Sequence, residues 1–590
     1  MKRKVNEALK IFGMVVFMGL ATNTANAYGA DVQINKTNFP DKFIRSTVKE
    51  YDANKDGKLS NKEIKKIKHL SGGTAEDYYE GRGKTIYSLK GVEHLYNLES
   101  IHCDIYKIKK ADFSHNKKLK DIHIEYAGGL KYINIKECKN LVNLEINDSS
   151  LKKLDVKNNK KLVNLNILDK NNIKSIDLSN NKKLKSLSME NGKLKSINLS
   201  NNKKLRELEI SGNNIKKINL KNNKKLIKVS VGNCGLTKLD LGKNRKVKVL
   251  VCGKNKIKKL NLCKLKNLKN LFCEGNKIES LDFSYNTKIE QVFASNNIIK
   301  VLKLGKNKRI KEIHLDNNKL KSLDFSKCNT LEVLECRNNM LEKIDVSTNP
   351  NLFQLVIDHN KLKDINLKGL KNLSTFCCYN NYLRSLDLSS NKELYILNCS
   401  SNNLKSLDLS GLENLDILDV SNNELEKLDL STNKGLTEVS CDKNKFEYLE
   451  EGSYYAVPEI IYRMKADHTL EVFANNSVAY HVDIADYVKI NGKNVKVTSI
   501  ADEAFSGYYC RKITIGKNVT SIGKNAFSNC EYLKNLIIKS KAIKEIGEGA
   551  FANHKKDVKV TVEKGFVDYY KNLLSKVFDF NVDKIVENTK

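Results

Sequence analysis

Apolar and polar positions follow a pattern that repeats every 21 residues along most of this chain. In each unit, apolar residues stand at positions 1, 4 and 6 and again at 11, 14 and 16, with asparagine usual at position 9. The units begin at Leu98, Leu119, Leu141, Leu162, Leu184, Leu205, Leu226, Val247, Leu268, Ile289, Ile310, Leu331, Leu352, Leu373, Leu394, Leu415 and Leu436. Positions 4 to 6 predict a short strand whose positions 4 and 6 face inward. Each unit can bury its apolar face only against its neighbours, so we expect one solenoid over residues 91–445.

A single unit shows the motif, opening with Leu205-Arg-Glu-Leu208-Glu-Ile210-Ser-Gly-Asn213. This string resembles the leucine-rich repeats of internalin-like bacterial surface proteins. The resemblance implies a mainly β solenoid with short helices, whose long strand surface binds other proteins. We expect the asparagine at position 9 to bond backbone groups where the chain turns.

A second repeat type begins near the C-terminus, after a connector expected at 446–486. Its motif ends in Ala504-Phe505, Ala526-Phe527 and Ala550-Phe551, with a period of 22 to 24 residues. It resembles the leucine-rich repeats of BspA-like bacterial surface antigens, here over residues 487–590. Residues 566–578 predict a helix that caps the last apolar layer, as the end of a repeat array requires.

The region before the repeats contains a loop with the spacing of an EF-hand. Over residues 52–63, oxygen-bearing groups stand at each prescribed position, with Gly57 at the turn: Asp52, Asn54, Asp56, the carbonyl of Lys58, Ser60 and Glu63. Helical spacing over 39–51 and 61–70 flanks the loop. The pattern predicts one calcium site, inside an N-terminal helical cap over residues 28–90. A loop that keeps its fold without metal is the alternative.

Residues 1–27 have the features of a secretory signal peptide. A basic start precedes an apolar run from Ile11 to Ala21, and Ala25-Asn-Ala27 forms a cleavage site. No later run is long enough to span a membrane. We therefore expect a protein that is secreted, extracellular or associated with the cell surface or cell wall.

Charge is sorted by position in the repeat. The chain carries 104 Lys and Arg against 69 Asp and Glu, a net charge of +35. Positions 5 and 7 of all units flank an inward side chain and should face outward, and these positions hold eleven Asp or Glu, one Arg and no Lys. An acidic to neutral binding face would produce this sorting. So would avoidance of stacked lysines, which repel one another at strand spacing.

The candidate contact residues lie on this face. Val251, Phe272, Phe293 and Tyr379 would supply apolar contacts, and Glu274, Asp316, Glu335 and Asp358 would supply charge complementarity. We expect exposed aromatic side chains at Phe272 and Phe293, with local packing as the alternative.

Cysteine positions argue for buried thiols. Seven of the 14 cysteines occupy position 6, where other units carry Leu, Ile or Val. A bridge between Cys510 and Cys530 stays open.

No nucleophile, zinc or phosphate-loop motif is present, and no nucleic-acid module is recognisable. The sequence therefore predicts a non-catalytic protein that binds another extracellular protein in the manner of an adhesin or receptor. The alternative is a structural envelope protein held on anionic cell wall polymer by its lysine-rich edges.

Overall fold

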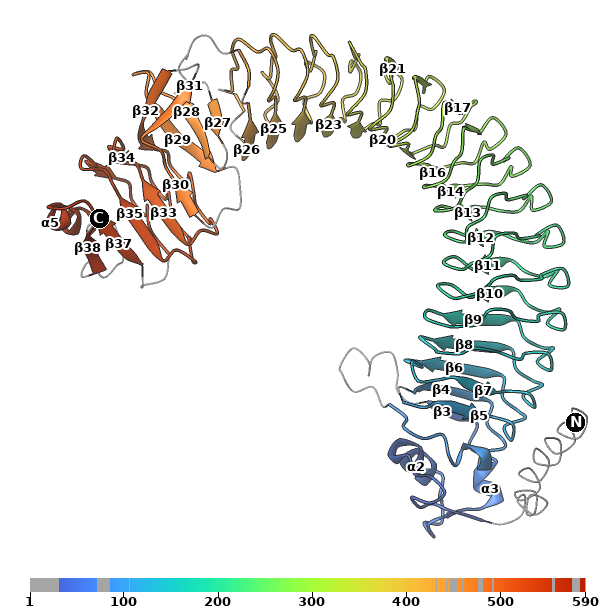
Figure 1. Ribbon diagram of the computed structural model, residues 1–590. Helices are drawn as coiled ribbons and strands as arrows, with labels where there is room; N and C mark the ends of the chain where they lie inside the picture. Colours follow the sequence, from blue (N-terminus) through green and yellow to red (C-terminus); the bar gives the residue numbers. More distant parts are fainter. Residues whose placement is uncertain are drawn as a thin grey trace, which may run out of the picture. The chain divides into compact units, whose positions relative to one another are not determined.

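The computed structural model describes residues 31–71, 85–105, 107–430, 432–433, 435–441, 443–445, 454–457, 460–475, 481–490, 493–553, 558–575 and 584–588. The predicted signal peptide, 1–27, lies outside the described residues. The chain divides into two compact units between Ile278 and Glu279. Both units are built from stacked coils and contain few helices (Figure 1).

The N-terminal region is a small helical cap. Helix α2 (Lys42–Lys49) begins at Asp41, whose side chain accepts the backbone N–H groups of Phe43 and Ile44. Such an N-cap satisfies donors that the first helical turn leaves free. Helix α3 (Asn61–Ile64) follows the loop, and β1 (Val32–Gln33) pairs antiparallel with β2 (Lys58–Leu59).

The second flanking helix is shorter than expected. The sequence predicted helical structure over 61–70, but α3 ends at Ile64 and His69–Ser71 form strand β3. Strand β3 pairs with β4, with Leu70 opposite Ile101. The cap therefore contributes the first strand of the repeat sheet. Of the three β3 residues, only Leu70 is buried.

In the first unit, the strands form one parallel sheet in which each coil contributes one strand. The short helix η1 (Val92–His94) precedes the first repeat. The sheet runs β3, β4 (Ser100–Asp104), β6 (Asp121–Glu125), β8 (Asn143–Asn147), β9 (Asn164–Leu168), β10 (Ser186–Ser188), β11 (Glu207–Glu209), β12 (Lys228–Ser230), β13 (Val249–Val251) and β14 (Asn270–Phe272). Strands β5 (Lys110–Asp112) and β7 (Tyr132–Asn134) pair on the other side of the coils.

The second unit continues the same coil architecture. Its parallel strands are β16 (Gln291–Phe293), β18 (Glu312–His314), β20 (Val333–Glu335), β22 (Gln354–Val356), β23 (Thr375–Cys377), β24 (Ile396–Asn398), β25 (Ile417–Asp419) and β26 (Glu438–Ser440). Two short pairs lie on the other side, β15 (Ser280–Asp282) with β17 (Val301–Lys303) and β19 (Ser322–Asp324) with β21 (Lys343–Asp345).

Two ladders of buried asparagines join neighbouring coils. At position 9, Asn339 Nδ2 donates to the carbonyls of Leu315 and Cys336 at 3.0 and 3.1 Å, and Oδ1 accepts the N–H of Leu320. This confirms the role expected for that asparagine. A second ladder lies further along each coil, where Asn202 Nδ2 donates to the carbonyls of Leu178 and Asn181 at 3.1 and 3.0 Å. Each ladder satisfies turn carbonyls that the sheet does not reach.

All 14 cysteines are free, and they are buried except for the partly exposed Cys263 and Cys377. Cys252 and Cys399 occupy position 6 and are fully buried. Burial raises the pKa of the Cys252 thiol to about 12. These thiols pack as small apolar groups, as their place in the repeat predicted.

The C-terminal repeats are preceded by further strands. Strands β27 (Tyr454–Val457), β28 (Ile460–Met464) and β29 (Leu470–Asn475) pair in antiparallel order. The same sheet then adds three parallel strands beside β29, which are β32 (Lys493–Ile500), β34 (Ser521–Ile522) and β36 (Glu545–Ile546). Strand β31 (Tyr487–Ile490) pairs antiparallel with β32. The second sheet runs β30 (His481–Asp483), β33 (Lys512–Ile515), β35 (Asn535–Ile538), β37 (Lys559–Val562) and β38 (Ile585–Glu587). It begins inside the expected connector.

A column of stacked phenylalanines forms the core of these C-terminal coils. Ring centroids of Phe505 and Phe527 are 5.1 Å apart, and those of Phe527 and Phe551 are 5.2 Å apart. Helix α5 (Val567–Leu574) lies within the helix expected at 566–578. Its buried Tyr570 donates from the hydroxyl to the carbonyl of Ser540 at 2.7 Å, which ties the helix to the preceding coil.

None of the helices in the described ranges combines the length and the apolarity that crossing a membrane requires.

Candidate functional site

The outward residues of the parallel strands form a surface that we call the strand face. Along β18 and β20 the side chains alternate, with the middle residue buried and its neighbours half-buried. Position 7, three places after each strand's centre, also lies on this face in these two coils, because Asp316 and Arg337 are half-buried whereas Leu315 and Cys336 before them are buried, so positions 5 and 7 point away from the core. In the second unit, the strand face holds a network of charged side chains on three neighbouring coils.

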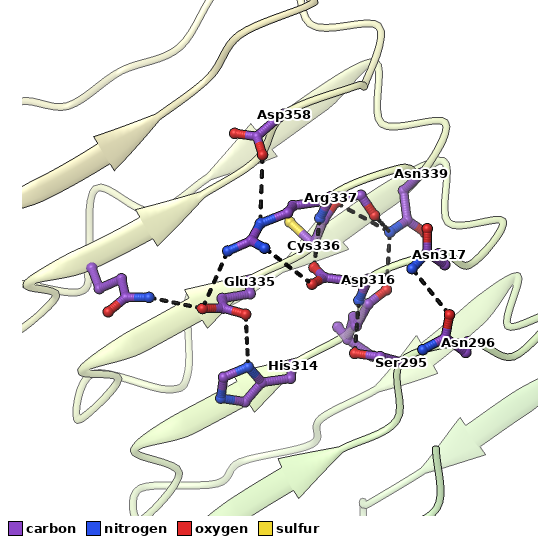
Figure 2. Close-up of polar contacts among 12 residues, drawn as sticks. Ser295, Asn296, His314, Asp316, Asn317, Glu335, Cys336, Arg337, Asn339 and Asp358 are labelled. Atoms are coloured by element: carbon purple, nitrogen blue, oxygen red, sulfur yellow. Dashed lines mark hydrogen bonds and ion pairs between the residues drawn. The ribbon is translucent and has the colours of Figure 1, made fainter. Parts of the chain in front are cut away.

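Arg337 is the centre of this network (Figure 2). Its guanidinium nitrogens lie 4.0 Å from Asp316 Oδ2, 3.5 Å from Glu335 Oε1 and 3.5 Å from Asp358 Oδ2. Asp316, Arg337 and Asp358 occupy position 7 in consecutive coils, so the repeat itself places one carboxylate on each side of the guanidinium. We call Arg337, Asp316, Glu335 and Asp358 the Arg337 cluster.

Neighbouring side chains hold Glu335 and Asp316 in place. Glu335 Oε1 accepts a hydrogen bond from Gln354 Nε2 at 2.7 Å, and Oε2 is 2.9 Å from His314 Nδ1. Asp316 Oδ1 accepts the backbone N–H of Arg337 at 2.8 Å. These contacts hold the two carboxylates in place, and His314 Nε2 also lies 2.8 Å from Glu312 Oε1.

Burial makes these carboxyl groups unlike the other aspartates of the repeat. Desolvation raises the pKa of Asp358 to about 7, although the nearby Arg337 opposes the shift. Desolvation also raises the pKa of Asp316. On the opposite side of the coils, hydrogen bonds from Ser326 and Ser347 lower the pKa values of Asp324 and Asp345. Asp324 and Asp345 in the turns therefore stay charged to lower pH than Asp316 and Asp358 do.

The aromatic candidates are less exposed than the sequence predicted. Phe293 is half-buried and lies flat on His314, with ring centroids 4.4 Å apart and planes 10° apart. Val251 and Phe272 are likewise half-buried, and they lie opposite each other on β13 and β14. Phe272 and Phe293 are therefore partly exposed on this face, and His314 covers part of the Phe293 ring.

The remaining candidates fall into two groups. Asp316, Glu335 and Asp358 come together around Arg337, while Tyr379 meets His359 edge to face at 4.8 Å, in the adjacent coil. Glu274 lies after β14, in the first unit. His359 was not among the predicted contact residues, although the sequence contains one signal. It stands at position 8 with φ of 52°, a left-handed conformation filled by asparagine at 296, 317, 338 and 380.

The predicted calcium loop is closed by its own hydrogen bonds. Asp52 Oδ2 accepts the N–H of Gly57 at 3.0 Å, and Asp56 Oδ1 accepts the N–H of Lys58 at 2.8 Å. Glu63 accepts the N–H groups of Ala53 and Ser60, both at 2.8 Å. The donors are hard oxygens of the kind that calcium prefers. No group of three or more His, Cys, Asp or Glu side chains that could hold a metal ion occurs among the described residues.

Comparison with known proteins agrees with the fold. Residues 483–586 match the family model described as the BspA type leucine rich repeat region, in six copies. The solved structure of YopM from Yersinia enterocolitica WA-314 is 15% identical and covers 83% of this chain and 98% of that one, with a TM-score of 0.52. No curated protein matches the sequence.

Two internalin structures are also similar. The functional domain of InlJ from Listeria monocytogenes, described as including a cysteine ladder, is 22% identical over 62% of this chain and 79% of that one, with a TM-score of 0.46. The internalin InlF from Listeria monocytogenes is 18% identical over 64% of this chain and 99% of that one, with a TM-score of 0.42. The fold of this chain is a leucine-rich repeat solenoid with BspA-type repeats at its C-terminal end.

Proposed function

We propose that this is a secreted or cell-surface protein that binds another protein through its strand face. The observation that carries the proposal is the segregation of charge in the second unit. In the second unit, lysine is absent from the outward residues of the parallel strands β16, β18, β20, β22, β23, β24, β25 and β26 and from position 7 of their coils, as far as these residues are described, although the whole chain has a net charge of +35. The same positions include six carboxylates and one guanidinium: Glu312, Asp316, Glu335, Asp358, Asp419, Glu438 and Arg337.

Apolar side chains lie beside these charges. Ile396 and Ile417 are half-buried and lie opposite each other on β24 and β25, one coil beyond Cys377. A surface with apolar and charged parts in fixed positions fits protein recognition better than it fits catalysis, since apolar contacts supply affinity and charges supply specificity. Avoidance of stacked lysines explains the missing Lys but not the accumulation of carboxylates.

Capture of extracellular proteins by the full chain tests this proposal. The experiment compares wild type with Ile417→Arg, which places a bulky charge on the strand face, and with Tyr285→Arg, a control at an exposed turn. Capture should persist from about 0.15 to about 0.5 M salt, where the Debye length falls by roughly half. It should be lost in Ile417→Arg and kept in Tyr285→Arg. Equal capture by both variants would refute binding through this face.

A second role rests on the lysines of the turns. Lys203, Lys204, Lys224 and Lys225 are exposed in neighbouring coils of the first unit and form a column of positive charge. We propose that this edge holds the protein on anionic cell wall polymer. Binding to purified wall material should then disappear at about 0.5 M salt, because exposed charges are screened, and it should be unaffected by Ile417→Arg.

We also propose that the loop over residues 52–63 binds one calcium ion, with Asp52, Asn54, Asp56, Ser60, Glu63 and the carbonyl of Lys58 as ligands. The oxygen donor set and Gly57, whose φ is +78°, support the proposal. Calcium at about 100 times its Kd should stabilise the folded protein by about 2.7 kcal/mol. Thermal unfolding with calcium or with chelator measures this. The Glu63→Gln variant should lose the shift, and an equal shift in that variant would place the ion elsewhere.

A further inference from the structure

Three neighbouring side chains on the strand face have buried polar atoms without hydrogen-bond partners. They are Nε of Arg337, Oδ1 of Asp358 and Nδ1 of His359. The other such atoms in the described parts of the chain belong to asparagine, serine and threonine, most of them to the ladder asparagines. All three titratable groups with such an atom are therefore gathered in two consecutive coils. A buried polar atom without a partner destabilises the folded state and calls for an explanation.

The charges around Arg337 indicate which kind of ligand the cluster lacks. Arg337 is shared by three carboxylates at 3.5–4.0 Å, and none of these contacts has the two short parallel bonds of a bidentate pair. One guanidinium therefore faces three carboxylates. The Arg337 cluster carries excess negative charge when these groups are ionised, and it has an unused acceptor at Asp358 Oδ1.

We propose that the Arg337 cluster binds the cationic side chain of an arginine or lysine on the partner protein, which rests on the proposed function of the strand face. The entering cation meets Asp316 and Glu335 first, since their side chains are 17% and 15% exposed. Asp358 is only 2% exposed. It is reached when Arg337, the most exposed member of the cluster at 40%, shifts aside.

Other ligands fit the cluster less well. An anion would pair with Arg337 but would be repelled by the three carboxylates around it. A metal ion is disfavoured, because no suitable group of three ligands was found in the described ranges. A cation that carries several N–H donors satisfies both the charge and the unused acceptor.

The adjoining apolar residues indicate the rest of the partner segment. Ile396 lies three coils beyond Glu335 along the sheet. At about 4.8 Å between strands, this separation is about 14 Å, or roughly four residues of an extended chain. The partner segment should therefore carry a basic residue and an apolar residue about four positions apart.

The test uses the full chain and two small probes, Nα-acetylarginine methylamide and its neutral counterpart Nα-acetylcitrulline methylamide, with binding followed by ligand-detected NMR. The arginine probe should bind at least about tenfold more tightly, which corresponds to one charge-assisted hydrogen bond. The Asp316→Asn/Glu335→Gln variant should lose this preference. Glu342→Gln, which removes an exposed carboxylate directly before β21, outside the strand face, should keep it.

Several outcomes would overturn the proposal. Equal binding of the two probes, or an unchanged preference in Asp316→Asn/Glu335→Gln with a native circular dichroism spectrum, would show that the cluster does not read a cation. Self-association that disappears in this variant, with no probe bound by wild type, would assign the cluster to a second copy of the chain. If a captured protein partner still binds the variant at full strength, this inference fails while the strand-face proposal stands.

Discussion

Arg337 and Asp358 lie 3.5 Å apart with opposite charges, yet each retains a buried atom that no hydrogen bond satisfies. Their separation allows attraction but not a good hydrogen bond. Burial outweighs that attraction, because the pKa of Asp358 is raised to about 7. Burying this pair therefore lowers the free energy of unfolding of the solenoid.

The stability of the protein should depend on pH through Asp358. Its folded-state pKa of about 7 lies above the value of about 3.9 for an unfolded aspartate. The folded state therefore holds the extra proton between these values, and its contribution to stability is lost as the pH rises through 7. Asp358→Asn does not titrate, so its stability should rise relative to wild type by up to about 1.4 kcal/mol per pH unit in this window.

Thermal unfolding of both proteins between pH 4 and 8.5 measures this difference. Asn201→Ala serves as the control, since neither side chain titrates and Asn201 is exposed, and its difference from wild type should stay flat. A constant difference between Asp358→Asn and wild type would show that Asp358 titrates as an ordinary aspartate.

Adjacent asparagines should differ sharply in their contribution to folding. Asn202 is fully buried and donates to two carbonyls, whereas Asn201 is exposed and donates to the carbonyl of Ser179. Asn202→Ala should cost about 1–3 kcal/mol, because two buried hydrogen bonds are lost while each of the two carbonyls keeps a backbone N–H partner. Asn201→Ala should cost less than about 1 kcal/mol. Urea unfolding of both variants measures the two losses of stability. Equal losses would contradict the role of the second ladder.

Two glycines with positive φ provide a similar pair. Gly91 has φ of +100°, and an added Cβ would overlap the ring of Phe39 and lie 2.6 Å from the carbonyl oxygen of Asn38. Gly57 has φ of +78°, but nothing lies near its missing Cβ. Gly91→Ala should destabilise the cap by more than about 2 kcal/mol, and Gly57→Ala by about 1 kcal/mol in calcium-free buffer. Limited proteolysis before residue 98 reports both effects.

Thiol alkylation should single out one cysteine. Cys263 and Cys377 are the partly exposed cysteines, and burial raises the pKa of Cys377 to about 11. The thiolate is the reactive form, so iodoacetamide at pH 8 should label Cys263 first and the buried cysteines only on unfolding. Peptide mass spectrometry reads the sites. Rapid labelling of Cys252 or Cys399 in the folded protein would contradict the packing described for position 6.

The sequence predicts the register of the coils because the period determines it. Glu207 pairs with Ser186 and Glu209 with Ser188, each 21 residues apart, as the repeat requires. Strand β3 was missed because His69-Leu70-Ser71 has one apolar residue and lies outside the repeat. Local pattern alone does not distinguish so short a strand from a helix end.

The Arg337 cluster was predictable only in part. The repeat showed that Asp316, Arg337 and Asp358 share a position, and hence a face. It could not show that Asp358 is buried or that Phe293 is stacked on His314, because these depend on side-chain lengths in neighbouring coils. Periodicity gives the direction in which a residue points, whereas its burial is decided by what stands on either side.

The constant length of the coils has a consequence for the history of the molecule. From Leu184 to Leu436 each unit begins 21 residues after the last, and most coils offer their neighbour equivalent carbonyls for the next asparagine. Gene recombination that gains or loses one 21-residue unit keeps this spacing across the new junction. The length of the strand face can therefore change in whole steps of about 4.8 Å without disturbing the remaining coils. Selection could in this way change the length of the binding surface without changing the outward residues that recognise the partner.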